Sequence, residues 1–112
     1  MAVKITTKEY KRVDLIQVDG RIDSSTAPQL EQALTKIIDE GRYRIVVDLS
    51  ETDFMSSAGL REIVTALKKA KRGAGDLRLA QPSDRVREVL EMAGLDTIFR
   101  IFSTQAEAVG SF

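Results

Sequence analysis

Hydrophobic residues along the chain fall into short runs that predict β-strands. The runs at 3–7 and 12–18 predict two strands, joined as a hairpin by the polar residues 8–11, with Gly20 after them as a breaker. Residues 45–49 form a β-branched run that is apolar on both faces apart from its end, which is typical of a strand covered on both sides. Residues 77–80 predict the next strand, and residues 98–102 predict a last short one.

Between these runs, apolar residues recur three and four positions apart, which indicates helices with one buried face. The first helix starts after Ser24-Ser25-Thr26 with Pro28 in its first turn and ends at Gly41. The second ends at Gly73, the third opens at residues 82–84 and ends at Gly94, and residues 104–109 predict a terminal helix. Their apolar positions are Ala27, Leu30, Ala33, Leu34, Ile37 and Ile38, then Leu60, Ile63, Val64, Leu67 and Ala70, then Val86, Val89, Leu90 and Ala93.

Strands that alternate with helices in this way predict an α/β fold. We expect a mixed, mostly parallel sheet of four to five strands, with three to four helices packed against it and right-handed crossovers. The two N-terminal strands would add an antiparallel edge. The 112 residues show no repeat, no low-complexity segment and no linker, so we expect a single domain over residues 1–112.

Composition narrows the possible functions. Seventeen basic and seventeen acidic residues give a net charge of zero, which argues against a nucleic-acid binder. The sequence has no histidine and no cysteine, so disulfides, thiolate nucleophiles, Cys/His zinc sites and imidazole acid–base chemistry are excluded. We therefore expect no cofactor, no metal and no enzymatic activity.

The longest runs without a charged residue are also informative. They span seven residues each, at 24–30 and 54–60, whereas a membrane-spanning helix needs about 20 apolar residues. The first residues lack an apolar stretch long enough for a signal peptide. We expect a cytoplasmic protein that does not bind membranes.

Two polar segments, 19–26 and 48–60, follow predicted strands and lead into helices. In open α/β sheets such carboxyl-terminal strand ends carry the functional groups. In the second segment, Ser56 and Ser57 stand where a helix begins, and helix capping is the simpler interpretation. The alternative interpretation is that one of the two hydroxyls is phosphorylated, because the backbone amides and the dipole at a helix N-terminus favour a phosphate. Of the bulky pair Phe54 and Met55, we expect one to fold into the core and the other to face a partner.

Enzymatic interpretations of this region fit poorly. Asp48 ends a strand as a phospho-acceptor would in a response-regulator receiver, but no acidic pair follows the first strand and no lysine follows 77–80. A glycine-rich loop ending in Lys and Ser or Thr is absent, which argues against nucleotide hydrolysis. Nucleotide binding at the corner of Asp23 and Ser57 would have only Arg21 to neutralise phosphates.

The stretch 46–60, VVDLSETDFMSSAGL, resembles the signature of the STAS domain of bacterial anti-sigma factor antagonists. Residues 20–23, Gly-Arg-Ile-Asp, followed by SSTAP, resemble a second marker of that family, and the order of elements agrees over nearly the whole chain. The resemblance implies partner switching. The unmodified protein binds an anti-sigma factor that is also a serine kinase, the kinase phosphorylates Ser57, and a serine phosphatase reverses the modification.

The resemblance also implies which residues form the site. The position before the phosphorylated serine is often Asp in the family and is Ser56 here, so Ser56 stays a second choice of acceptor. The implied partner-binding residues are Asp23, Ser24, Asp53, Phe54, Met55, Ser56, Ser57, Ala58, Gly59 and Arg61.

Two further expectations concern assembly and charge. The alternative to partner switching is an unphosphorylated STAS subunit of a larger signalling or lipid-transport assembly. By itself the chain is expected to be a monomer or a weak homodimer. Asp48, Glu51 and Asp53 give residues 48–56 a charge of −3, so a phosphate on Ser57 would add to an acidic segment.

Overall fold

A six-stranded sheet organises the chain in a computed structural model that describes residues 3–112. The strands are β1 (Lys4–Glu9), β2 (Asp14–Ile22), β3 (Arg44–Asp48), β4 (Thr52–Met55), β5 (Asp76–Ala80) and β6 (Ile101–Phe102). The helices are α1 (Ala27–Asp39), α2 (Ser57–Arg72), α3 (Asp84–Met92) and α4 (Gln105–Gly110), with a 3-10 turn η1 (Leu95–Thr97). The alternating order confirms the predicted α/β class.

The strand order is β1-β2-β3-β5-β6, and β4 pairs with β2 off this path. β1 runs antiparallel to β2 as the predicted hairpin, and the other pairings are parallel. The prediction that Gly20 breaks the strand is wrong, because β2 continues through it to Ile22. Gly20 has φ of 110° and sits where the register against β4 shifts, so it bends β2 away from β3 and toward β4.

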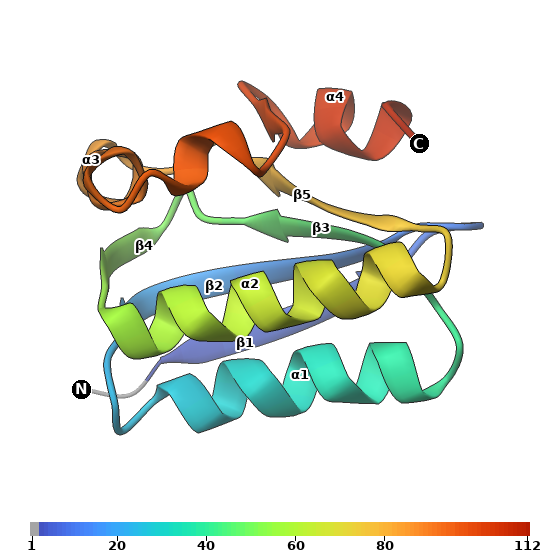
Figure 1. Ribbon diagram of the computed structural model, residues 1–112, viewed down its shortest axis with the longest axis horizontal. Coiled ribbons are helices and arrows are strands. Elements are labelled where there is room, and N and C mark those ends of the chain that lie inside the picture. The colour runs from blue at the N-terminus through green and yellow to red at the C-terminus, as the bar shows by residue number, and fades with distance from the viewer. Residues whose placement is uncertain (1–2) are drawn as a thin grey trace.

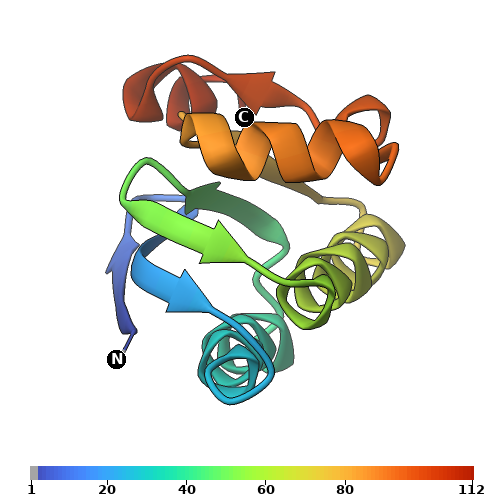
Figure 2. The same cartoon turned by 90° about the vertical axis from the view of Figure 1, so that its left-hand side faces the viewer.

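The helices form layers on the sheet (Figures 1 and 2). α1 and α2 lie side by side over one face, where their apolar stripes join the inward side chains of β2, β3 and β5 in the main core. α4 covers the other face through a smaller cluster of Val13, Leu15, Val46, Ala80 and Ala108. β3 therefore has apolar contacts on both faces, as its continuous hydrophobic run predicted.

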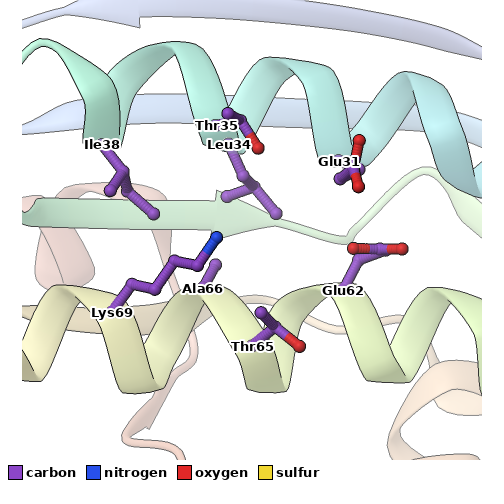
Figure 3. A pocket seen from close by; sticks show the side chains of 8 residues that line it. All are labelled: Glu31, Leu34, Thr35, Ile38, Glu62, Thr65, Ala66 and Lys69. Carbon is purple, nitrogen blue, oxygen red and sulfur yellow. The ribbon is translucent and has the colours of Figure 1, made fainter.

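The groove between α1 and α2 shows how closely these two helices pack. Figure 3 shows its walls, with Leu34 and Ile38 from α1 opposite Ala66 and Lys69 from α2. The groove encloses about 40 Å³, which is room for no more than a few water molecules.

Two predicted boundaries are wrong. Residues 52–55, which the sequence predicts to be part of a polar segment between a strand and a helix, form β4. The last strand is only Ile101–Phe102, because the backbone of Gly94 enters the left-handed region and Ile98 N–H donates to Leu95 C=O, which closes η1. Across residues 3–112, no helix has the length and hydrophobicity needed to span a bilayer.

Candidate functional site

The two segments singled out in the sequence meet at one edge of the sheet. β2 and β4 are parallel neighbours, with Ile22 opposite Met55, and Ser56 N–H donates to Ile22 C=O at 2.9 Å. The loop that begins at Asp23 therefore lies beside the start of α2. Figure 2 looks onto this end of the molecule, where β2, β4 and the N-termini of α1 and α2 all face the viewer.

The two serines at the start of α2 differ in accessibility. Ser56 precedes the helix with an extended backbone, and its side chain makes no capping hydrogen bond. Its Oγ is buried and has no hydrogen-bond partner among residues 3–112. Ser57 is the first helical residue and is exposed. The capping interpretation is therefore wrong for Ser56, and only the Ser57 hydroxyl lies open to solvent.

The bulky pair divides as predicted between core and surface. Met55 is 1% exposed and packs in the main core, so in this structure its side chain, expected among the partner-binding residues, is not open to a partner. Phe54 is half-buried, and the Arg21 guanidinium carbon lies 4.2 Å from the centre of its ring. This cation–π contact holds the Phe54 ring at the surface, beside the loop that begins at Asp23.

Gly59 is also buried rather than available to a partner. A Cβ built at this position would lie 2.5 Å from Ile22 Cγ2 and 2.8 Å from Met55 Cγ, closer than side-chain atoms can pack. The absence of a side chain lets the first turn of α2 rest directly on β2 and β4. Gly59 therefore sets the height of Ser57 above the sheet.

Asp23 organises the loop between β2 and α1. Its Oδ1 accepts hydrogen bonds from Ser25 N–H at 2.9 Å and from Ser25 Oγ at 2.7 Å, and Oδ2 lies 3.3 Å from Arg21 Nε. The hydrogen bonds from the Ser25 side chain and backbone, with smaller contributions from Thr26 and Arg21, lower the pKa of Asp23 to about 2. The carboxylate is thus ionised at neutral pH and held within its own loop.

Asp48 departs from the expected acidic surface. It is 2% exposed, and its carboxylate accepts hydrogen bonds from Ser50 N–H at 2.9 Å, Gln81 Nε2 at 3.1 Å and Gln105 Nε2 at 2.7 Å. Burial raises the pKa of Asp48, but the hydrogen bonds outweigh it and hold the pKa below its usual value. Only Glu51 and Asp53 of the three acids are exposed.

The remaining site residues lie at the surface of this edge to different degrees. Ser24, Asp53 and Arg61 are exposed, and Asp23, Ser56 and Ala58 are partly buried. No sequence pattern points to Gln81 and Gln105, because these two amides are far from Asp48 in the chain and reach it only through the packing of β5 and α4. Within the described residues, no group of three acidic side chains could hold a metal ion.

The exposed hydroxyl at a helix N-terminus defines what this edge can do chemically. Four backbone N–H groups at such an end lack helical partners, and together with the helix dipole they stabilise an anion. Arg61 follows Ser57 by one helical turn, on the same face of α2. A negatively charged group on Ser57 would therefore lie at the N-terminus of α2, one helical turn from Arg61.

Comparison with known proteins assigns the chain to a family. The family model of the STAS domain matches residues 4–108. The Bordetella bronchiseptica protein BtrV is 33% identical over 98% of this chain and 95% of its own length. The Listeria monocytogenes anti-sigma-B factor antagonist is 30% identical over 99% of this chain and 96% of its own.

Solved structures agree with the fold. The anti-sigma factor antagonist SpoIIAA superposes in its unphosphorylated form with a TM-score of 0.84 at 23% identity, covering 95% of this chain and 93% of that one. The Bacillus SpoIIAA in its phosphorylated form superposes with a TM-score of 0.78 at 22% identity, covering 96% and 98%. The protein therefore belongs to the STAS domain family, alongside relatives named anti-sigma factor antagonists.

Proposed function

We propose that this protein is an anti-sigma factor antagonist that works by partner switching. It binds an anti-sigma factor with serine kinase activity while Ser57 is unmodified, and phosphorylation of Ser57 by that kinase releases it. A serine phosphatase restores the binding form. The protein performs no catalysis and acts as ligand and substrate. The observation that carries this proposal is the exposed Ser57 at the first position of α2, beside the buried hydroxyl of Ser56.

The choice of Ser57 over Ser56 rests on access. A kinase must bring the acceptor oxygen into line with the γ-phosphate, which requires a hydroxyl open to solvent. The Ser56 Oγ is buried under the start of the helix, so phosphorylating it would require the helix start to open. Ser57 meets this requirement as it stands.

The release step follows from charge. A phosphate adds about −1.5 to −2 charges at pH 7. In the free protein this charge is favoured by the N-terminus of α2 and lies one turn from Arg61. A partner docked here would instead have to desolvate the phosphate next to the exposed Asp53. A loss of about 3 kcal/mol weakens binding more than a hundredfold.

The relatives support the same function. The Listeria monocytogenes protein is named for antagonism of an anti-sigma-B factor, and SpoIIAA is described in both unphosphorylated and phosphorylated forms. A phosphorylation switch requires that a protein with this fold can exist in an unphosphorylated and a phosphorylated form, as SpoIIAA does.

The acceptor can be tested by intact mass. We would incubate the wild type, Ser57→Ala and Ser56→Ala with ATP and an extract of the protein's own cells. The wild type and Ser56→Ala should each gain the mass of one phosphate, and Ser57→Ala should gain none. Phosphate on Ser57→Ala would contradict the choice of acceptor. A wild type that never gains phosphate would favour the unphosphorylated subunit of a larger assembly.

The switch is tested by affinity for the kinase purified from those cells. Ser57→Ala should bind it like the unmodified wild type and should not be released by ATP. Ser57→Asp should bind at least tenfold more weakly, because its carboxylate adds a negative charge to the docking surface. The loss should be smaller than that caused by phosphorylation, because one carboxylate carries only part of the charge of a phosphate. Equal affinity of Ser57→Asp and unmodified protein would refute the switch.

A further inference from the structure

The outer face of α3 lies at the same end of the molecule as Ser57. Figure 2 shows α3 lying across this end, next to β4. Val86 and Leu90 anchor the helix in the core. On the other side, Arg85, Glu88, Val89 and Met92 follow one another at helical spacing; we call these four residues the α3 stripe. The stripe is exposed except for Val89, which is partly buried.

A depression separates the stripe from Phe54. It has a volume of about 490 Å³ and is lined by Phe54, Asp84, Arg85, Glu88 and Val89. Phe54 is held in place by the Arg21 guanidinium, and it lies three residues before Ser57 in the chain. The depression therefore lies between the α3 stripe and β4, the strand that leads into Ser57.

The side chains of the stripe are suited to contact with a protein. Met92 is 83% exposed, the highest value among the large hydrophobic side chains exposed within residues 3–112. One exposed hydrophobic residue is ordinary, but Met92 lies on the same helix face as Val89, which lines the depression together with Phe54. Methionine adapts its shape to many partners. Arg85 and Glu88 take part in no ion pair among the described residues, so both charges are available to opposite charges on a partner.

We propose that the protein partner that docks over Ser57 also covers the α3 stripe and that the stripe sets which partner is accepted. The partner would place an apolar side chain in the depression between Phe54 and Val89, against Met92, and opposite charges against Arg85 and Glu88. This inference rests on the proposed function, because it extends the same docking surface. Ser57 then switches binding on and off, while α3 selects the partner.

The control for this proposal is on the same helix. Arg87 is exposed and lies on the opposite side of α3 from the stripe, two residues from Arg85. Arg87→Glu thus makes the same change of charge as Arg85→Glu on the same element. Any effect of net charge alone, or of the substitution on the stability of α3, appears in both variants.

The test measures the affinity of the purified kinase for unphosphorylated variants, with thermal unfolding recorded for each. Arg85→Glu and Glu88→Lys should each raise Kd about tenfold, which corresponds to 1.4 kcal/mol. Met92→Ala should raise it severalfold, and Arg87→Glu should stay within twofold of the wild type. At low kinase concentration, the rate of Ser57 phosphorylation should fall in parallel, with the rate at saturation unchanged.

The outcomes separate this inference from the proposed function. If the three stripe variants bind within twofold of the wild type while Ser57→Asp is weakened, the inference is wrong and the switch stands. If Arg87→Glu weakens binding as much as Arg85→Glu, the effect is not specific to the stripe and the inference is also wrong. If Ser57→Asp binds like the wild type, the proposed function fails.

Discussion

Removing the Asp48 carboxylate should destabilise the protein measurably, because it joins three elements at one point. Asp48 is the last residue of β3. Its partner Gln81 follows β5, and its partner Gln105 begins α4. A net hydrogen bond to a charged group contributes about 1.5–3 kcal/mol, and the three bonds are offset by the cost of burying the carboxylate. For Asp48→Ala we expect a loss of about 2–4 kcal/mol in the free energy of unfolding.

The measurement is urea unfolding followed by circular dichroism at pH 7. Asp48→Asn should lose less, because the Asn oxygen still accepts from Ser50 N–H and the Gln amides can turn their oxygens toward the new NH₂ group. Asp53→Ala is the matched control, since this exposed acid should change stability by less than about 0.5 kcal/mol. Amide exchange should also accelerate in α4 for Asp48→Ala.

The pH dependence gives an independent check. The folded-state pKa of Asp48 lies below its ordinary value, so the carboxylate contributes its full stability above the unfolded pKa of about 3.9. That contribution is lost as the pH falls through the folded pKa. The difference between wild type and Asp48→Asn should be constant from pH 7 to about pH 5 and shrink below that. An Asp48→Ala loss under about 0.5 kcal/mol, or a gap that widens in acid, would refute the reasoning.

Two other predictions concern packing. Gly59→Ala should destabilise the protein by about 1–3 kcal/mol in urea unfolding, because the added methyl group collides with Ile22. Gly110→Ala is the control and should be neutral or slightly stabilising, because a Cβ there meets nothing within 4 Å. Equal effects of the two substitutions would contradict this account. Arg78→Ala should speed hydrogen exchange over residues 105–112, because it removes two contacts that hold the end of the chain. Arg78 Nη1 donates to Ser111 C=O at 2.6 Å, and the guanidinium lies 3.9 Å from the centre of the Phe112 ring. Unchanged exchange over these residues would show that the two contacts do not hold α4.

The hydrophobic pattern was sufficient for the main elements of the fold and for the location of the site. Helical stripes and β-branched runs report burial directly, so α1, α2, β3 and β5 could be located from the sequence. β4 could not, because four residues that include an acid, Asp53, carry no clear strand period. Gly20 is ambiguous in the sequence for a related reason, since a glycine can mark either the end of a strand or a bulge within one.

Within the site, the sequence located the segment but not the orientation of its side chains. Ser56 and Ser57 are chemically identical, and only their positions relative to the helix start make one buried and the other exposed. The sequence alone groups Asp48 with the exposed acids Glu51 and Asp53, because its partners Gln81 and Gln105 are distant in the chain. Contacts between residues far apart in the chain decided each of these cases.

The attachment of β4 has a consequence for motion. Within residues 3–112, β4 is paired only with β2, through Thr52, Phe54 and Met55, whereas β3 is bordered by β2 and β5. Opening β4 therefore breaks one short ladder and leaves the central sheet intact, so it should cost less free energy than unfolding the domain. Because β4 leads directly into α2, such a local opening would free the strand that precedes Ser57 while the central strands stay paired.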